Sequence, residues 1–566
     1  MAREDMAHED MTYEIVIRGG TVVDGTGAPG RIDDVAVDGG RIVAIGPDLH
    51  GERELDATGH VVAPGFIDIH THYDAQVFWD PGLTPSAFHG VTTVVAGNCG
   101  FSIAPTREEG VGILSRTLQH VEDMSLDTLT VGVPWSEFES FGQYLDAVEA
   151  RGVGLNYACY VGHTAVRLYV MGDDAYERTA TPDELDRMRT IVADALAAGA
   201  IGFATSASPT HNGDRGRPVP SRVADMDEVR ALVAPLRDAG RGVVALLPGG
   251  VIPHDEMFAL QREVGRPITW TALLTMAGRP YHEGVISDHD AARAEGVDVW
   301  PQVSCRPLVF QMNMEEPFTM NLRPTFAELM DGSREQRIAA YADPAWRATA
   351  WDEVSGRSGA LPVNWPALSV AESDAHPELV GRGVVELAEE RGCTPLDVVL
   401  DLSLEEDLRT RFSSVLANDD DDAIAWLLPR DGVLLGLADS GAHVSQLCDA
   451  CFATDLLGNW VRDRGVMSLE RAIHKLTAEP AEVYGLSERG VIEVGRAADL
   501  VVFDPATVAP GPVRRVRDFP ADGERLTADA PVGMRHVIVN GVPIRVDGAQ
   551  VPDDVAGRPG VVLRAR

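Results

Sequence analysis

Two histidines, His70 and His72, stand at the end of an apolar run, in Gly65-Phe-Ile-Asp-Ile-His-Thr-His-Tyr-Asp74. Successive side chains of a β-strand point to opposite faces, so residues two apart share a face and both imidazoles point the same way. Two neutral imidazoles at a strand end form half of a site for a first-row metal ion. The spacing therefore predicts a metal site that residues elsewhere in the chain complete.

Two candidates for the remaining ligands are Cys99 and Asp439, each of which follows an apolar run of its own. Cys99 lies in Gly97-Asn-Cys-Gly100, and a thiolate is a good zinc ligand; a small buried apolar side chain is the alternative. An aspartate before Ser-Gly usually caps a helix. Opposite a His-x-His pair, Asp439 is instead a candidate metal ligand and the general base that takes a proton from water.

Three further residues are candidates for contact with a substrate. His163, in Val161-Gly-His-Thr-Ala-Val-Arg167, is predicted to polarise a substrate carbonyl, with metal binding and loop orientation as alternatives. His443 follows Asp439 by four residues and is predicted to line the same site. Arg306 is predicted to bind a substrate carboxylate, because its guanidinium matches that group. An ion pair with acidic residues of the segment that follows is an equal alternative for Arg306.

These residues stand at the ends of predicted strands that alternate with segments of helical periodicity, such as Pro182–Ala198 and Met226–Ala239. Eight strand–helix repeats predict a closed (β/α)₈ barrel of the TIM type, in which chemistry sits at the C-terminal ends of the strands. The predicted strands are Val61–His70, Val91–Gly97, Gly154–Val161, Ala200–Thr205, Val243–Leu247, Ile268–Leu274, Val297–Val303 and Val433–Ala438.

Short strands with glycine turns occupy both ends of the chain, and we expect them to pair into one small β-sandwich. The predicted organisation is residues 1–62 for its N-terminal part, 63–480 for the barrel and 481–566 for its C-terminal part. A large insert at about 307–430 separates the seventh strand from the eighth, which is far more than a barrel loop needs. We interpret it as a lid or substrate-selecting subdomain, with an oligomer contact as the alternative.

The composition of this chain is that of a globular protein. Of its 566 residues 45% are apolar and 24% charged. The net charge of −39 argues against nucleic acid or an anionic membrane as a partner. No run reaches the roughly 18 apolar residues of a membrane helix, and the polar N-terminus lacks the apolar core of a signal peptide. We therefore expect a cytoplasmic protein.

On these motifs the chain resembles the amidohydrolase superfamily, and within it the N-acyl-D-amino-acid deacylase (D-aminoacylase) branch. The matching segments are Gly65–His72, Gly97–Gly100, Gly162–Arg167, Ala438–Asp439 and Leu469–Asp504. The resemblance implies a metal-dependent amide hydrolase with a (β/α)₈ barrel and a composite β-sandwich. It also implies removal of the acyl group from an N-acyl-D-amino acid, with His70, His72 and Cys99 as metal ligands and Asp439 as catalytic aspartate.

The sequence departs from that family at two strands. The family expects a histidine at the ends of strands five and six, where this chain reads Val243–Pro248 and Ile268–Leu274 without one. The nearest histidines, His254 and His282, lie several residues further on. Some relatives bridge two metal ions with a carboxylated lysine at strand four, but the single lysine here, Lys475, lies beyond strand eight.

We therefore predict one zinc ion, held by His70, His72, Cys99 and Asp439, and leave a second metal open. The predicted substrate is a small N-acyl amino acid or related amide, and a homo-oligomer is compatible with the sequence. Two alternatives remain. One is hydrolysis of another amide, a lactam or an ester by the same residues. The other is a barrel that has lost catalysis and serves as a binding subunit.

Overall fold

The structure is a computed structural model that describes residues 12–317, 320–330, 332–356 and 363–565. Eight parallel strands form its central sheet, and each of the eight predicted barrel strands contributes one of them. In order across the sheet they are β6 (Phe66–Asp68), β7 (Val91–Ala96), β8 (Asn156–Gly162), β9 (Gly202–Ser206), β10 (Val243–Leu247), β11 (Ile268–Trp270), β12 (Val299–Val303) and β16 (Leu434–Leu435).

The curled sheet closes between its first and last strands. Thr71 and Ser440 form a parallel bridge, and the amide of His72 donates to the carbonyl of Ser440 at 2.7 Å. Closure brings the ends of β6 and β16 side by side although about 370 residues separate them. It thereby places the His-x-His segment beside the segment that carries Asp439, and the predicted TIM-like barrel is confirmed.

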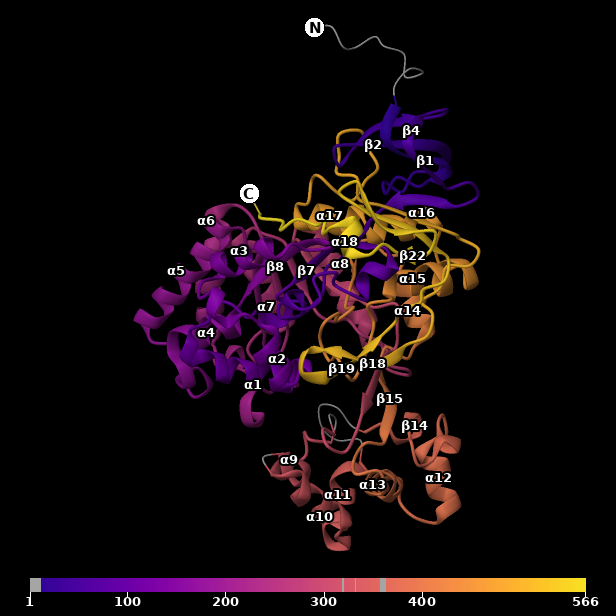
Figure 1. Cartoon of the computed structure of the whole chain (residues 1–566). Coiled ribbons are helices and arrows are strands. Elements are labelled where there is room, and N and C mark those ends of the chain that lie inside the picture. The colour runs from indigo at the N-terminus through magenta and orange to yellow at the C-terminus, as the bar shows by residue number, and fades with distance from the viewer. Residues whose placement is uncertain (1–11, 318–319, 331, 357–362, 566) are drawn as a thin grey trace.

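Helices between the strands cover the outside of the barrel (Figure 1). They begin well because their first turns are capped: α5, for example, has Thr181 as N-cap in a capping box with Glu184 and a proline at its first position. The helices around the barrel are α1 (Val111–Glu122), α2 (Leu126–Gly132), α3 (Phe141–Arg151), α4 (His163–Met171), α5 (Pro182–Ala198), α6 (Met226–Ala239), α7 (His254–Val264), α8 (Tyr281–Ala294), α14 (Asp421–Leu427), α15 (Phe452–Asp455), α16 (Leu469–Leu476) and α17 (Ala478–Tyr484).

The two ends of the chain pair in one mixed sheet, as predicted. Its central contact is the antiparallel pairing of β5 (Val61–Pro64) with β17 (Leu500–Phe503), where Val62 faces Val502. One apolar core, which includes Ile17, Val35 and Leu500, joins residues from both ends. The other strands are β1 (Thr12–Val22), β2 (Arg31–Asp38), β3 (Arg41–Gly46), β4 (His50–Asp56), β20 (Met534–Val539), β21 (Val542–Val546) and β22 (Ala549–Gln550).

The first predicted barrel strand, Val61–His70, is in fact two strands that belong to two sheets. β5 ends at Pro64 in the mixed sheet and β6 begins at Phe66 in the barrel. Gly65 is the single residue that connects the two strands, and a Cβ at this position would collide with the side chain of Thr92. Periodicity alone could not show the division, because both halves are apolar and fully buried.

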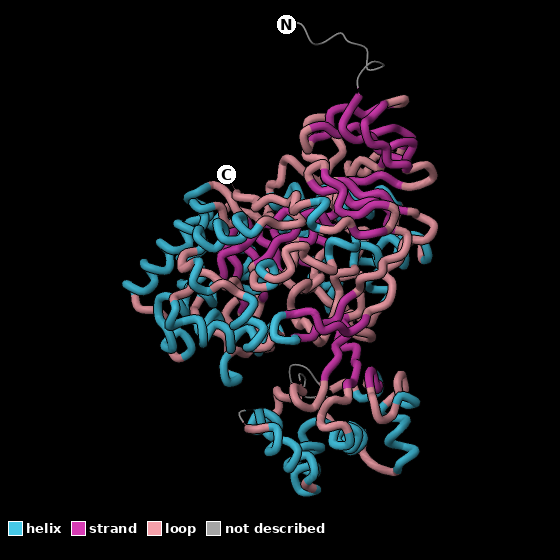
Figure 2. Tube along the Cα trace, viewed as in Figure 1, coloured by secondary structure: helices cyan, strands magenta, loops and turns pink. Residues whose placement is uncertain are grey.

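The segment between β12 and α14 forms a body with an apolar core of its own, which includes Phe326, Tyr341 and Phe412. A three-stranded sheet joins this insert to the barrel, and Figures 1 and 2 show it at the opposite end of the molecule from the mixed sheet. Its elements are β13 (Leu308–Met312), α9 (Pro324–Met330), α10 (Arg334–Ala342), α11 (Pro344–Val354), β14 (Ser369–Glu372), α12 (Val384–Arg391), α13 (Pro395–Glu405) and β15 (Arg411–Ala417).

The C-terminal part of the chain also returns to the barrel. The hairpin of β18 (Arg514–Phe519) and β19 (Gly523–Thr527) packs Phe519 against Trp79, with ring centroids 5.3 Å apart. The last segment runs beside β8, where the amide of Leu563 donates to the carbonyl of Tyr157 at 2.7 Å. No helix among the described residues combines the length and the apolar character that a membrane crossing needs.

Candidate metal centre and cavity

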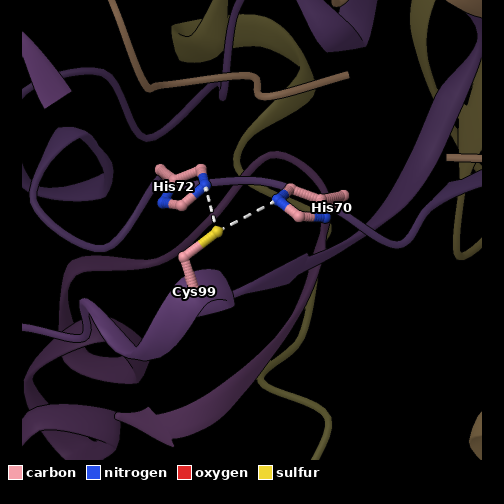
Figure 3. A group of neighbouring side chains, drawn as sticks. All are labelled: His70, His72 and Cys99. Carbon is pink, nitrogen blue, oxygen red and sulfur yellow. Dashed lines mark hydrogen bonds between the residues drawn. The ribbon is translucent and has the colours of Figure 1, made fainter. Parts of the chain in front are cut away.

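The side chains of His70, His72 and Cys99 converge at the C-terminal ends of β6 and β7 (Figure 3). Sγ of Cys99 lies 3.5 Å from Nε2 of His70 and 3.8 Å from Nε2 of His72, and all three donor atoms lie within 4.8 Å of one another. Cys99 has φ of 56°, a left-handed conformation in a short turn after β7 that aims its thiol at the two imidazoles.

Asp439 adds a carboxylate from the end of β16. Its Oδ1 lies 3.1 Å from Nε2 of His70 and 3.7 Å from Nε2 of His72. Zinc bonds of about 2.0–2.3 Å in a tetrahedron separate neighbouring ligand atoms by roughly 3.3–3.8 Å. The distances of Sγ of Cys99 and of Oδ1 of Asp439 from the two Nε2 atoms lie in or close to that range. His70, His72 and Cys99 form a group with the spacing of a metal site, and Asp439 lies beside it.

A second layer of side chains fixes which ring nitrogens face the centre. Gln302 donates through Nε2 to Thr269, so its Oε1, 2.7 Å from Nδ1 of His70, accepts a hydrogen bond from the N–H at that nitrogen. Oε1 of Glu122 lies 3.0 Å from Nδ1 of His72. With a proton kept on each Nδ1, a metal ion that displaces the Nε2 protons now facing Asp439 would take the Nε2 lone pairs of both histidines.

The electrostatics of the cluster favour a cation. Burial by itself raises the pKa of Asp439, but hydrogen bonds and charge from His70 and then His72 hold it well below its ordinary range. Burial likewise lowers the pKa of His70, but the negative charges of Cys99 and Asp439 outweigh burial and raise it to about 10. Asp439 is therefore an ionised carboxylate, and the centre stabilises positive charge beside it.

A cavity of about 400 Å³ opens beside this centre. The ends of β10 and β11 contribute Leu247, Trp270 and Ala272 to its wall, at the two strand ends where the resemblance implied histidines. His254 also lines the cavity, but its ring packs edge-on against Trp270 with centroids 4.7 Å apart. His282 does not line it and packs against Trp426 instead. The described residues thus supply donors for one metal ion at this site and none from strands five and six.

The structure places His163 away from the cavity. The side chain is completely buried, with Nδ1 2.7 Å from Oγ1 of Thr205 and Nε2 2.9 Å from Oε1 of Glu228. Arg167 donates to both oxygens of the same glutamate. Both nitrogens of His163 are therefore engaged in a buried network between α4, β9 and α6.

Arg306 is also absent from the residues that line the cavity. Its Nε lies 2.7 Å from Oδ1 of Asp449, and its Nη1 lies 3.2 Å from Oδ1 of Asp455. The ion pairs are therefore with the segment after strand eight, not with the insert. His443 does line the cavity, where its ring packs edge-on against Phe310 with centroids 5.0 Å apart.

Lys475 lies on α16, where Nζ donates to Glu479 at 2.9 Å and to the carbonyl of Val433 at 2.8 Å. It does not line the cavity, which agrees with the expectation that no lysine bridges two metals here.

Sequence reasoning missed four residues that the structure brings to the site: Glu122, Gln302, His211 and Thr271, whose Oγ1 lies 3.0 Å from Nδ1 of His70. Gln302 carried a usable signal, because it is a polar residue in the buried strand Val299–Val303. Glu122 and His211 carried none, since they stand on a helix end and a loop whose paths periodicity does not predict.

A barrel that gathers two histidines, a cysteine and an aspartate at the ends of its strands has the architecture of a metal-dependent hydrolase. The chain belongs to the amidohydrolase family, whose model matches residues 53–545.

Two D-aminoacylases are among its relatives. D-aminoacylase from Alcaligenes xylosoxydans xylosoxydans is 30% identical over 552 residues, 95% of each chain. A solved D-aminoacylase structure matches with a TM-score of 0.67 at 29% identity, and the match covers 98% of this chain and 100% of that one. That enzyme has a binuclear metal centre, described as activated by one metal and attenuated by the second. The expected relationship to D-aminoacylases is therefore confirmed.

An N-acyl-D-glutamate deacylase from Bordetella bronchiseptica provides a structure with zinc and a phosphonate inhibitor that mimics the tetrahedral intermediate. It has a TM-score of 0.68 at 26% identity, and the match covers 98% of this chain and 100% of that one. These relatives bind metal, and this chain retains a His, His and Cys group at the strand ends.

Proposed function

We propose that this protein is a one-zinc amide hydrolase that removes the acyl group from N-acyl-D-amino acids. The observation that carries the proposal is the convergence of His70, His72, Cys99 and Asp439 at the mouth of a cavity of about 400 Å³. A zinc ion held by these side chains would polarise an amide carbonyl and lower the pKa of a water molecule toward about 7. The one-metal activation described for a D-aminoacylase supports a single ion as sufficient.

Asp439 acts as the general base in this proposal. Its carboxylate is ionised, because the positive charge of His70 and His72 holds its pKa well below the ordinary range, and a zinc ion between them would favour the charged form in the same way. It takes a proton from the attacking water and delivers it to the leaving nitrogen, so that the amide gives a carboxylic acid and an amine. The same base serves both steps, because one proton is accepted and the same proton is released.

His211 takes the carbonyl-polarising role that the sequence suggested for His163. Oγ of Ser206 accepts from the amide of Ser208 at 3.2 Å and lies 2.8 Å from Nδ1 of His211. If the hydroxyl proton points to Nδ1, the ring carries its own proton on Nε2. Burial and, after it, the electrostatic influence of the neighbouring histidines lower the pKa of His211 to about 3, so it stays a neutral donor. His163 braces the barrel through Glu228.

A second candidate is hydrolysis of a neutral amide, lactam or ester. The observation that favours it is that no arginine or lysine is among the described residues that line the cavity, so a substrate carboxylate would meet no cationic partner there. His443 remains a candidate for substrate contact, whereas Arg306 is held by two aspartates outside the cavity.

Metal analysis and a substrate panel test the proposal. Protein purified without chelators should hold close to one equivalent of zinc, and less than about a tenth of an equivalent of any transition metal would reject a metal-dependent reaction. N-acyl-D-amino acids, their L-enantiomers, and neutral amides, lactams and esters should then be compared by kcat/KM. Activity confined to the neutral compounds would favour the second candidate, and metal without turnover on any member would favour a binding subunit.

A further inference from the structure

Part of the cavity wall, much of it at and after the ends of β10 and β11, is apolar. We call this part the apolar chamber and define it by six residues that line it: Leu247, Trp270, Ala272, Leu274, Val285 and Leu308. Several of them, such as Leu247, Leu274 and Leu308, are only partly buried within the protein. Apolar side chains that face an open cavity lose contact with water when an apolar ligand group covers them.

The chamber is held in shape by its neighbours. Trp270, at the end of β11, donates through Nε1 to Nε2 of His289 at 3.1 Å and stacks on that ring with centroids 5.7 Å apart. The ring of His254 packs edge-on against the same indole, with ring centroids 4.7 Å apart. The indole is therefore a fixed wall, and a ligand group meets a preformed surface.

Among the residues that the structure describes, no arginine or lysine lines the cavity that contains the chamber. Burial lowers the pKa values of His211, His254 and His443, so these cavity-lining imidazoles are neutral near pH 7. The acidic groups that line the cavity, Glu122 and Asp439, face the metal-binding histidines and would repel a second anion. An unpaired carboxylate moved from water into such a place loses its hydration without gaining a counterion, which is strongly unfavourable.

We propose that the apolar chamber binds an uncharged alkyl or aryl group of the substrate and excludes acidic groups. The proposal rests on the proposed amide hydrolysis and names its substrate class. Amides with a long or aromatic acyl group, or with an apolar amine part, are the substrates that fit. Amides that carry a carboxylate at the end of the group facing Trp270 and Leu274 do not.

The rate experiment uses zinc-loaded full-length protein and N-acyl-D-leucines with acyl chains from acetyl to octanoyl. Each buried methylene should raise kcat/KM by about fourfold until the chamber is full. N-hexanoyl-D-leucine is matched with its analogue in which the terminal methyl is a carboxylate, and the analogue should be at least about tenfold poorer. A parallel series of N-acetyl-D-amino acids with apolar or acidic side chains tests the amine part. The proposal would be overturned if kcat/KM did not change along either series and the acidic analogue had the same kcat/KM as N-hexanoyl-D-leucine.

A binding experiment separates this inference from the proposed function. Butanamide, hexanamide and octanamide, and the ω-carboxylate analogue of hexanamide, are titrated calorimetrically into the same protein. Tighter binding with length and rejection of the carboxylate, without hydrolysis of any amide, would keep the chamber and reject the hydrolase. Hydrolysis with a preference for the acidic analogues would keep the hydrolase and reject the chamber.

A pair of variants locates the effect. Leu274→Arg places a cation in the chamber and should improve the ratio of acidic to apolar substrate by at least about tenfold, while Leu274→Met should leave that ratio unchanged. Zinc content and thermal unfolding show that each variant is folded. A folded Leu274→Arg protein with the wild-type ratio would contradict the placement, and the wild-type series stands as a test if that variant does not fold.

Discussion

The cavity has two walls built from the same kind of position. On one side the residues after β6, β7 and β16 supply His70, His72, Cys99 and Asp439; on the other the ends of β10 and β11 supply Leu247 and Trp270. In a (β/α)₈ barrel all strand ends open on one face, so each position is equally able to carry a ligand. The side chain at each end thus decides the chemistry, and here the ends of β6, β7 and β16 carry potential metal donors, whereas those of β10 and β11 carry apolar side chains.

The ligand wall depends on partners that the apolar wall does not need. His70 and His72 each use Nδ1 to contact a polar side chain, Gln302 and Glu122 respectively, which orients the ring. Trp270 needs one hydrogen bond and otherwise packs against rings. The difference teaches that a change of only a few residues abolishes metal binding at the ligand wall. The apolar wall, in contrast, keeps its function through many apolar substitutions of similar volume.

The largest expected effect comes from the ligand wall. Asp439→Asn removes the base but leaves His70, His72 and Cys99, so kcat should fall by about 10²–10⁴ while zinc stays bound. Turnover on the best amide of the panel and metal content of the same sample are the measurements. Asp431→Asn, at an exposed aspartate just before β16, is the control and should match the wild type. Unchanged kcat in Asp439→Asn would reject the role of the aspartate as base.

A smaller effect is expected from the side chains that contact the metal-binding histidines. Glu122→Gln keeps the shape of the side chain but removes the charge beside Nδ1 of His72, and zinc affinity should fall by about 10–100-fold. Competition with a chelator measures the affinity. Glu109→Gln, at an exposed glutamate before α1, should have no effect. Equal affinities in the two variants would show that the carboxylate of Glu122 does not support the metal site.

Substitutions in the apolar wall can also make the two walls alike. Leu247→His combined with Ala272→His places imidazoles at the ends of strands five and six, and zinc content should rise from one equivalent toward two. The same change should weaken the preference for long acyl chains. Each single variant is a control, because one added histidine does not complete a second site. A double variant that stays at one equivalent would show that more than these two side chains separates the walls.

The smallest effect on the cavity is expected from the network around His163. Burial alone raises the pKa of Glu228, but hydrogen bonds and charge from His163 and Arg167 lower it from its ordinary 4.5 to about 2. A lowered carboxyl pKa stabilises the fold above about pH 4.5, and this stability is lost as the pH falls toward 2. Integrated over the shift, the contribution is about 3 kcal/mol.

The variant Glu228→Gln tests this pH dependence of the stability. The difference in unfolding free energy between wild type and variant should be largest above pH 4.5 and shrink as the pH falls toward 2. Urea unfolding at a series of pH values measures it. Zinc content and the chain-length preference should stay at their wild-type values, since neither wall includes this network. A difference independent of pH would show that the carboxylate acts through packing rather than charge.

The sequence predicted much of the ligand wall because its residues follow local rules. Alternation along a strand places His70 and His72 on one face, and the strand–helix count places Cys99 and Asp439 at the same end of the barrel. The departure at strands five and six was equally readable, since Leu247 and Trp270 stand where histidines were expected. All eight barrel strands were predicted, although the first predicted strand extended across Gly65 and so included β5 of the neighbouring mixed sheet.

What only the tertiary structure decided is which groups these side chains meet. His163 and Arg306 stand at strand ends like the ligands, yet Glu228 from α6 and two aspartates beyond β16 hold them away from the cavity. His211, Glu122 and Gln302 reach the site through a loop, a helix end and a distant strand. Periodicity fixes the face on which a residue lies, but long-range packing fixes its partner, because that contact depends on the paths of segments far apart in the chain.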